Sequence, residues 1–228
     1  MISTPLKLII FDCDGTLVDS QHMIVGAMHE TFKVAGLAPV DDLAVRRIVG
    51  LSLVEAIAVL LPDMPEQEHA RLAEVYKKAF YRLRVEEAAG PDPLYPGTKA
   101  VLEQLNAEGY LLGVATGNSV RGLNRVLEEH SLRHLFVTLQ TADSHPSKPH
   151  PSMIHTAVAE AGSSPQAAMM IGDTTFDMMM AKNAGAHGLG VDWGYHQSHE
   201  LKSSGATEVV SSFLDIPAYV KSVLGAVA

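Results

Sequence analysis

Two pairs of aspartates in this sequence have the spacing and setting for metal or phosphate chemistry. Asp12 and Asp14 directly follow the apolar run Leu6–Phe11, and on an extended backbone two such carboxylates can face the same space. Asp173 and Asp177 stand where a helix should begin, a position that acids also take as partners of the helix dipole. Four carboxylates in one pocket repel one another unless a hard cation binds them, and an all-oxygen site suits Mg²⁺ best. The four aspartates therefore predict a magnesium site.

Two further segments could hold an anion beside those acids. Thr116, Gly117 and Asn118 precede an expected helix, where a hydroxyl and free backbone N–H groups form a cradle for an anion. A simple helix cap made by Asn118 or Ser119 explains this pattern equally well. Lys148 stands beside a proline ahead of another helix, so it is either a fixed cation that neutralises phosphate charge or an ordinary solvated lysine.

The elements that must position these residues alternate between strand and helix. Short apolar runs typical of buried strands lie at Leu6–Phe11 and at residues 111–115, 135–140, 168–171 and 188–191. Helical patterns lie at residues 98–109, 120–130, 152–162 and 174–185. Such alternation predicts an α/β fold with a Rossmann-like parallel sheet covered by helices on both faces. Ligands in that fold bind beyond the carboxyl ends of the strands, where all four polar segments stand.

Residues 19–90 interrupt this alternation. They contain successive amphipathic helical patterns at residues 22–36, 41–50, 52–61 and 66–90, with no strand pattern between them. The Pro91-Asp92-Pro93 segment then marks the return to the alternating part. We therefore expect two domains: an α/β core formed by residues 1–18 and 91–228, and an α-helical cap formed by residues 19–90.

Four ordered motifs in this sequence resemble those of the haloacid dehalogenase superfamily: Asp12-x-Asp14-Gly15-Thr16, Thr116, Lys148 and Gly172-Asp173-x-x-x-Asp177. The helical insert after the first motif resembles the α-helical cap of the phosphoglycolate phosphatase-like branch, which also includes β-phosphoglucomutase and phosphonatase. This resemblance spans the whole chain. It implies a Mg²⁺-dependent phosphatase that hydrolyses a small phosphate monoester through an aspartyl-phosphate intermediate.

The resemblance also implies a role for each acid of the motifs. Asp12 would be the nucleophile, and Asp14 would protonate the leaving oxygen and then deprotonate the attacking water. Mg²⁺ would be bound by the carboxylates of Asp12 and Asp173 and by the backbone carbonyl of Asp14. Asp177 would bond either to metal-bound water or to Lys148.

Other residues of the motifs and of the cap would bind the substrate. The phosphoryl oxygens would be held by a hydroxyl, two backbone amides and an ammonium group, those of Thr116, Gly117, Asn118 and Lys148. The segment that contains Arg46, Gly50 and Ser52 resembles the substrate-specificity loop of this branch, where glycine lets the backbone approach the ligand. Arg46 could bind a substrate carboxylate or a second phosphate, although an exposed arginine on a cap helix has the same pattern.

The substrate and the fate of the phosphoryl group stay open at the level of sequence. Phosphoglycolate is the leading substrate, with sugar phosphates, pyrophosphate and nucleoside monophosphates as alternatives. Within the superfamily the resemblance associates Asp14 with phosphoryl transfer rather than with dehalogenation or phosphonate cleavage. A phosphosugar mutase of the β-phosphoglucomutase type and a catalytically inactive protein that binds phosphate or a partner are the alternative functions.

The amino-acid composition limits the partners and the cellular location that can be expected for this protein. With 47% hydrophobic and 19% charged residues, the 228-residue chain can bury a substantial core. Its 17 basic and 26 acidic residues give a net charge of -9, which disfavours nucleic acid, and no apolar run approaches the roughly 20 residues that cross a bilayer. We expect a cytoplasmic protein, a monomer or weak homodimer, whose partner is a small phosphorylated metabolite.

The single cysteine and the histidines do not predict a redox or transition-metal site. Because Cys13 is the one cysteine in the sequence, an intramolecular disulfide is excluded. Strand alternation points Cys13 away from Asp12 and Asp14, which predicts a buried thiol. Two groups of histidines could suggest a transition metal, but they lack the i, i+4 pairing of a zinc-binding helix. We therefore expect a surface position for six of them: His145, His150, His155, His187, His196 and His199.

Overall fold

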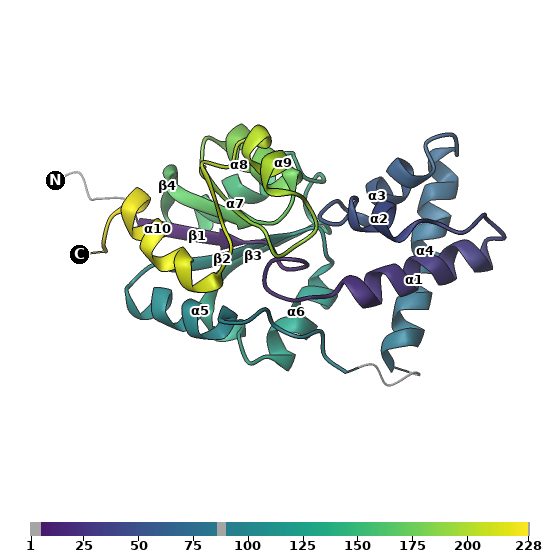
Figure 1. The fold of residues 1–228 in the computed structure, drawn as a ribbon, viewed down its shortest axis with the longest axis horizontal. Coiled ribbons are helices and arrows are strands. Elements are labelled where there is room, and N and C mark those ends of the chain that lie inside the picture. Colours follow the sequence, from purple (N-terminus) through teal and green to yellow (C-terminus); the bar gives the residue numbers. More distant parts are fainter. Residues whose placement is uncertain (1–5, 86–89, 228) are drawn as a thin grey trace.

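A six-stranded parallel sheet forms the centre of the molecule, seen in a computed structural model that describes residues 6–85 and 90–227 (Figure 1). The strand order is β3-β2-β1-β4-β5-β6, and every neighbouring pair is parallel. The strands are β1 (Leu6–Phe11), β2 (Leu111–Thr116), β3 (Phe136–Thr141), β4 (Ser163–Gly172), β5 (His187–Val191) and β6 (Glu208–Val210). The predicted α/β fold class with a Rossmann-like sheet is confirmed.

Helices cover both faces of this sheet, and the side chains of β1 show why. Leu8 and Ile10 pack in one buried cluster with α7 and α8, whereas Ile9 and Phe11 pack in another with α5, α6 and α10. Both faces of the strand are therefore apolar, as a central parallel strand requires. The helices of this part are α5 (Thr98–Ala107), α6 (Val120–Glu129), α7 (Ser152–Glu160), α8 (Thr175–Ala184), α9 (Ser198–Ser204) and α10 (Ile216–Leu224).

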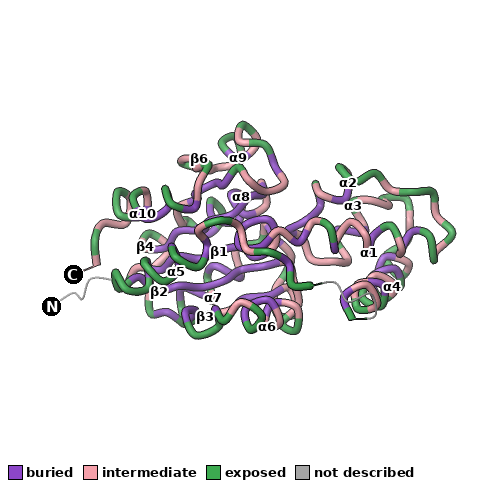
Figure 2. The backbone as a smooth tube through the Cα atoms, turned by 60° about the horizontal axis from the view of Figure 1, so that its bottom comes forward, coloured by how far each residue is buried: buried purple, intermediate pink, exposed green. Residues whose placement is uncertain are grey.

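The described residues from 19 to 85 contain helices and no strand, and they lie beside one end of the sheet (Figures 1 and 2). Met28, Phe32, Ile57 and Leu72 form part of a separate buried cluster there. The helices are α1 (Gln21–Val34), α2 (Asp42–Arg46), α3 (Leu53–Leu60) and α4 (Glu66–Val85). The pattern expected over residues 66–90 thus ends at Val85, and residues 86–89 lie outside the described part.

The chain leaves the sheet and returns to it through two adjacent segments. Val18 forms an antiparallel bridge with Leu94, and the backbone N–H of Asp19 donates to the carbonyl of Pro93 at 2.9 Å. Both segments therefore pass the carboxyl end of β1, which places the helical residues next to the polar motifs.

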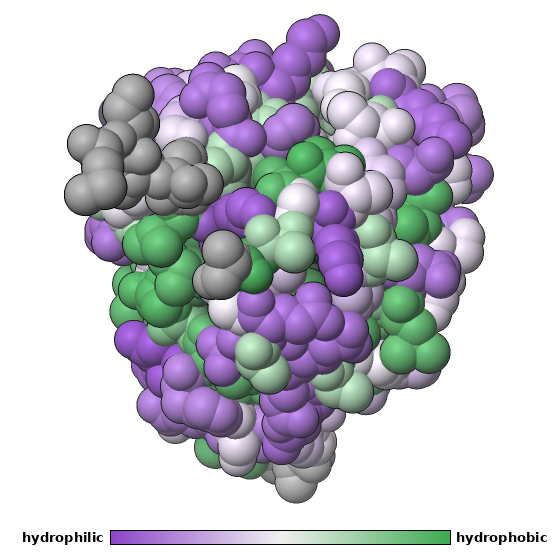
Figure 3. All heavy atoms as spheres, turned by 90° about the vertical axis from the view of Figure 1, so that its left-hand side faces the viewer, coloured by the Kyte–Doolittle hydropathy of each residue, from purple (hydrophilic) through white to green (hydrophobic). Residues whose placement is uncertain are grey.

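Sequence patterns missed the elements after β5. The edge strand β6 has three residues, all partly exposed, so it lacks the apolar run of the central strands. The strand expected at residues 135–140 begins one residue later, because Leu135 belongs to a short 3-10 turn. Within the described ranges, no helix combines the length and the apolar character needed to cross a membrane. Figure 3 shows the end of the molecule away from α1–α4, where hydrophobic side chains are interspersed with hydrophilic ones.

Candidate active site

Asp12 lies directly after β1 and is anchored to the neighbouring strand. Its backbone N–H donates to the carbonyl of Ile171 at 2.9 Å, and its side chain is buried. Its Oδ1 accepts a hydrogen bond from the Cys13 N–H at 2.7 Å and forms an ion pair with Lys148 Nζ at 2.9 Å. The buried Oδ2 has no partner among the described residues. Burial, reinforced by Asp177, raises the pKa of Asp12 well above its ordinary value although Lys148 opposes this shift.

Lys148, in the loop between β3 and α7, is buried and pairs with two carboxylates. Besides the contact with Asp12, its Nζ donates to Asp177 Oδ1 at 2.7 Å. Burial alone would lower the pKa of Lys148, but the two carboxylates outweigh it and raise the pKa above its ordinary value. Lys148 is therefore a fixed internal cation, not a solvated lysine.

Asp173 and Asp177, at the end of β4 and the start of α8, are held by separate sets of donors. Asp173 Oδ1 accepts from the Thr16 hydroxyl at 2.7 Å, and its Oδ2 accepts from the Tyr195 N–H at 2.9 Å. Asp177 Oδ2 accepts from the Thr174 hydroxyl at 2.7 Å and from the Thr174 N–H at 3.1 Å. Burial and the neighbouring Asp177 raise the pKa of Asp173 to about 7.

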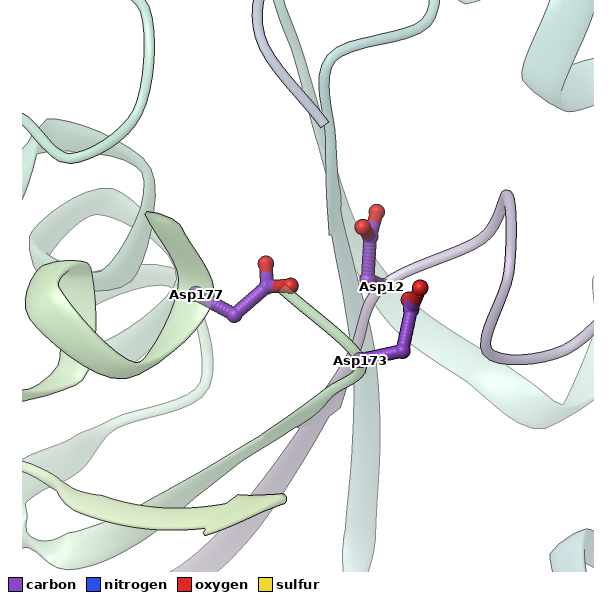
Figure 4. Close-up of side chains that lie close together, drawn as sticks. All are labelled: Asp12, Asp173 and Asp177. Atoms are coloured by element: carbon purple, nitrogen blue, oxygen red, sulfur yellow. The ribbon is translucent and has the colours of Figure 1, made fainter. Parts of the chain in front are cut away.

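Three of the four predicted metal-binding aspartates converge at one point (Figure 4). One oxygen each from Asp12, Asp173 and Asp177 lies within 4.8 Å of the others, and all three side chains are buried. In the described part of the chain, Lys148 is the cation that pairs with this cluster. Three buried carboxylates against one ammonium group, together with the unpaired Oδ2 of Asp12, leave room for further positive charge. The hard oxygen donors fit Mg²⁺.

The side chain of Asp14 lies outside this cluster. Its Oδ1 accepts from the Ser20 hydroxyl at 2.7 Å, and its Oδ2 accepts from the Asn118 side-chain amide at 3.2 Å. The backbone N–H of Asn118 donates to the Thr116 hydroxyl at 3.2 Å. Ser119, not Asn118, caps α6. Asn118 is thus free of the capping role and lies between Asp14 and Thr116.

The segment between α2 and α3 approaches the sheet closely at Gly117. A Cβ at Gly117 would lie 2.5 Å from the Leu51 carbonyl oxygen and 2.6 Å from that of Gly50, distances that real Cβ atoms do not show. The Ser52 N–H donates to the Ser147 hydroxyl at 2.8 Å in the loop that carries Lys148. Gly50 and Ser52 therefore lie against the motif residues, and both line the adjoining cavity.

The structure contradicts the surface position expected for His196. His196 is buried, not at the surface: its Nδ1 accepts from the Thr175 N–H at 3.1 Å, and its Nε2 lies 3.2 Å from the Arg47 carbonyl oxygen. Arg47 also pairs with Glu200 at 2.9 Å. Arg46 does not line the cavity, and its buried Nε has no partner among the described residues. Of the other five histidines, His150, His155 and His199 are exposed, while His145 and His187 are partly exposed.

Sequence reasoning missed several residues that support the acids. Thr174 and Asp177 form a capping box, which Thr followed by an acid three residues later could have indicated. Tyr195 carries no such signal because it acts through its backbone N–H. Gly15 adopts a φ of 86°, and a Cβ there would lie 2.4 Å from Asp173 Oδ2, so this position requires glycine.

A cavity of about 660 Å³ opens beside these residues, between the carboxyl end of the sheet and helices α1, α3 and α4. Its lining includes Asp12, Asp14, Thr116, Gly117 and Asn118 from the sheet side. The fully buried Lys148, Asp173 and Asp177 lie behind this wall. Carboxylates, a hydroxyl and the backbone of Gly117 and Asn118 therefore lie at one end of an open space.

Known proteins resemble this chain over most of its length. The sequence model of the haloacid dehalogenase-like hydrolases matches residues 9–191. A curated protein from Dickeya dadantii named probable phosphatase IndB is 35% identical over 92% of this chain and 91% of its own length. A phosphoglycolate phosphatase from Agrobacterium fabrum is 33% identical over 86% of this chain and 84% of its own length.

Solved structures resemble the whole fold. A hydrolase from Pseudomonas syringae superposes with a TM-score of 0.83 at 26% identity and covers 95% of this chain and 99% of its own. A haloacid dehalogenase-like family hydrolase from Streptococcus pneumoniae has a TM-score of 0.81 at 26% identity and covers 94% and 98% of the two chains. Both comparisons include the helical residues as well as the sheet.

Proposed function

Because the chain belongs to the haloacid dehalogenase-like hydrolase family, we propose that it is a Mg²⁺-dependent phosphatase of small phosphate monoesters. The observation that carries this proposal is the buried Lys148, which pairs with Asp12 and Asp177 while Asp12 Oδ2 stays unpaired at the edge of the cavity. Phosphatase names among the relatives support it, and phosphoglycolate, which several of those names contain, is the first ester to assay.

Asp12 and Asp14 divide the chemistry between them in this proposal. A carboxylate oxygen of Asp12 attacks phosphorus in line, and the bond to the leaving oxygen breaks with its electron pair on that oxygen. Asp14, which lines the cavity, supplies the proton that completes the alcohol. Asp14 then takes a proton from water, which attacks phosphorus, and cleavage of the bond to Asp12 restores its carboxylate and releases phosphate.

The surrounding residues position the phosphoryl group. The Thr116 hydroxyl, the backbone amides of Gly117 and Asn118, and the Lys148 ammonium group would hold the equatorial oxygens. Mg²⁺ held by the cluster of Asp12, Asp173 and Asp177 would add positive charge where the phosphoryl group gathers negative charge. The backbone carbonyl of Asp14 is the further ligand we propose.

Residues 19–90 would act as a cap domain on a core formed by residues 1–18 and 91–228. The close approach of Gly50 and Leu51 to Gly117 supports this division, because it brings the loop between α2 and α3 onto the phosphate-binding segment. Excluding water from the site strengthens the electrostatic interactions within it. Gly50 and Ser52 line the cavity, whereas Arg46, the third substrate contact proposed in this segment, lies outside the lining.

The test is to measure phosphate release from p-nitrophenyl phosphate with Mg²⁺ for the wild type and for Asp12→Asn. The variant keeps the size of the side chain but is not a nucleophilic carboxylate, so turnover should be abolished while the circular dichroism spectrum is retained. Asp63→Asn serves as the matched control, because Asp63 is exposed and lies outside the cavity. Its activity should equal that of the wild type.

Three results would contradict the proposal. Turnover by a well-folded Asp12→Asn variant would exclude Asp12 as the nucleophile. Absence of phosphate release from a panel of esters, despite bound Mg²⁺, would favour a protein that binds phosphate without hydrolysing it. Transfer of the phosphoryl group to a second hydroxyl of a sugar phosphate in preference to water would identify a mutase.

A further inference from the structure

Beyond the proposed phosphate-binding end, the lining of the cavity is mostly apolar. We use the name apolar chamber for the part of the cavity lined by residues of α1, α3 and α4, among them Ile24, Met28, Val54, Tyr76, Phe80 and Tyr81. These side chains come from the helical residues, whereas the catalytic carboxylates face the cavity from the sheet. The alcohol part of a bound ester would therefore extend into this chamber.

Aromatic rings form the wall of the chamber next to α6, and arginines hold them. The Arg121 guanidinium lies over the ring of Tyr81 at 5.6 Å from its centroid, and that of Arg125 lies over Phe80 at 5.5 Å. Arg84 lies over the same Phe80 ring at 5.6 Å. The rings of α4 are thus fixed against α6 of the sheet part, and cation–π contacts stabilise this wall.

The charges around the chamber are largely engaged with one another. Arg84 is buried and pairs with Asp92, and Arg125 reaches the same carboxylate at 3.9 Å. Lys77 pairs with Glu74 at 2.7 Å. Arg121, which also lines the cavity, has no carboxylate partner among the described residues, but it is exposed to solvent. A carboxylate in the chamber would therefore lose hydration without gaining a buried cation that lacks a carboxylate partner.

We propose that the chamber binds the alcohol part of the substrate and that this alcohol is an uncharged, ring-bearing group, not a short carboxylate such as glycolate. This inference rests on the proposed phosphatase function. Ligand pockets of roughly 300–1,000 Å³ enclose ligands of drug size, so a two-carbon acid would leave most of the 660 Å³ cavity unfilled. The Tyr76 hydroxyl has no hydrogen-bond partner in the described ranges and can bond to one polar atom of the alcohol.

Three phosphate esters of primary alcohols separate this inference from the alternatives. The alcohol part of ethyl phosphate is small and uncharged, that of 2-phenylethyl phosphate adds an apolar ring, and that of phosphoglycolate adds a carboxylate. The intact protein with Mg²⁺ should show a kcat/KM for 2-phenylethyl phosphate at least about tenfold above those of the other two, because the ring buries apolar area. The leaving oxygens are all alkoxides, so their intrinsic reactivity contributes little to this difference.

Two variants locate the preference in the aromatic wall. Phe80→Ala should reduce the ratio of kcat/KM between 2-phenylethyl and ethyl phosphate at least about fivefold, because part of the ring-binding surface is removed. The ratio does not depend on how much of the sample is folded, and Tyr81→Ala provides an independent second variant. Val59→Ala, on the exposed side of α3 and outside the cavity, should leave the ratio unchanged.

These measurements distinguish failure of the chamber inference from failure of the proposed phosphatase function. Equal kcat/KM values for the ethyl and phenylethyl esters, or a higher value for phosphoglycolate, would overturn the ring-binding chamber while leaving the phosphatase intact. An unchanged ratio in both wall variants would also overturn it. No release of phosphate from any of the esters would instead refute the phosphatase proposal itself.

Discussion

Replacing Lys148 with methionine removes the cation that pairs with the buried carboxylates and keeps an unbranched side chain. At 2.9 Å from Asp12 and 2.7 Å from Asp177, each attraction amounts to about 6 kcal/mol for an effective dielectric constant of about 20. Desolvation of the lysine offsets much of this, and breaking a buried pair by removing one partner costs about 3–5 kcal/mol. We expect Lys148→Met to lower the free energy of unfolding of the metal-free protein by that amount. The corresponding fall in Tm is about 6–20 °C, at about 2–4 °C per kcal/mol.

Thermal and urea unfolding with EDTA, and then with Mg²⁺, measure this effect. Mg²⁺ should stabilise Lys148→Met more than the wild type, because the variant loses the ammonium group that pairs with Asp12 and Asp177. Phosphate release should fall by about 10²–10³ in the variant, as for loss of one preorganised donor. The control is Lys99→Met, since Lys99 is exposed on α5. A loss below about 1 kcal/mol, or activity within about tenfold of the wild type, would refute the reasoning.

Three further predictions concern acid–base chemistry, protonation and closure. Asp14→Asn should slow both halves of the reaction by about 10²–10⁴ while Asp12 still becomes phosphorylated, which intact-mass spectrometry after mixing with substrate would detect. Asp173 has a pKa of about 7 when folded against an ordinary 3.8, so folding favours its protonated form and stability is lost as the pH rises through this window. One pH unit corresponds to about 1.36 kcal/mol, so between about pH 4 and 7 the free energy of unfolding of the metal-free wild type should fall by up to about 4 kcal/mol more than that of Asp173→Asn. Urea unfolding measures this difference, and the same pH dependence in both proteins would contradict the prediction. Gly117→Ala should reduce kcat/KM by about 10²-fold, because its Cβ would displace the Leu51 carbonyl, whereas Gly26→Ala should have no effect on kcat/KM.

The convergence of the acids and the lysine could be expected because the strands are parallel. Asp12 and Asp173 each follow a buried apolar strand, and the carboxyl ends of parallel strands meet at one edge of the sheet. β1 and β4 are direct neighbours in the sheet, so the two aspartates lie side by side although 161 positions separate their numbers. The apolar strand patterns, together with the rule that ligands bind at the carboxyl ends of parallel strands, were therefore sufficient to predict that these aspartates converge.

Contacts that depend on long-range packing had no comparable pattern in the sequence. His196 has the sequence surroundings of a loop residue, but it is buried because its ring packs edge-on against Phe176 and lies 3.2 Å from the Arg47 carbonyl oxygen of the helical residues. Asp92 stands in a proline-containing connection, yet it pairs with Arg84 of α4 and lies near Arg125 of α6. Such positions follow from how two separately packed parts meet, which hydrophobic periodicity within one segment does not describe.

Asp12 and Asp14 are two residues apart, but the structure gives them different environments. Burial raises the pKa of Asp12, and the adjacent ammonium group of Lys148 opposes this rise by stabilising the ionised carboxylate that a nucleophile needs. Asp14 is only partly buried, and a group that exchanges protons with a substrate and with water must reach the cavity. Its two donors come from opposite sides: Ser20 precedes α1 of the helical residues, and Asn118 precedes α6. The orientation of the proposed proton donor therefore depends on how the helical residues sit on the sheet, so that movement of α1 would alter acid–base chemistry before it altered the nucleophile.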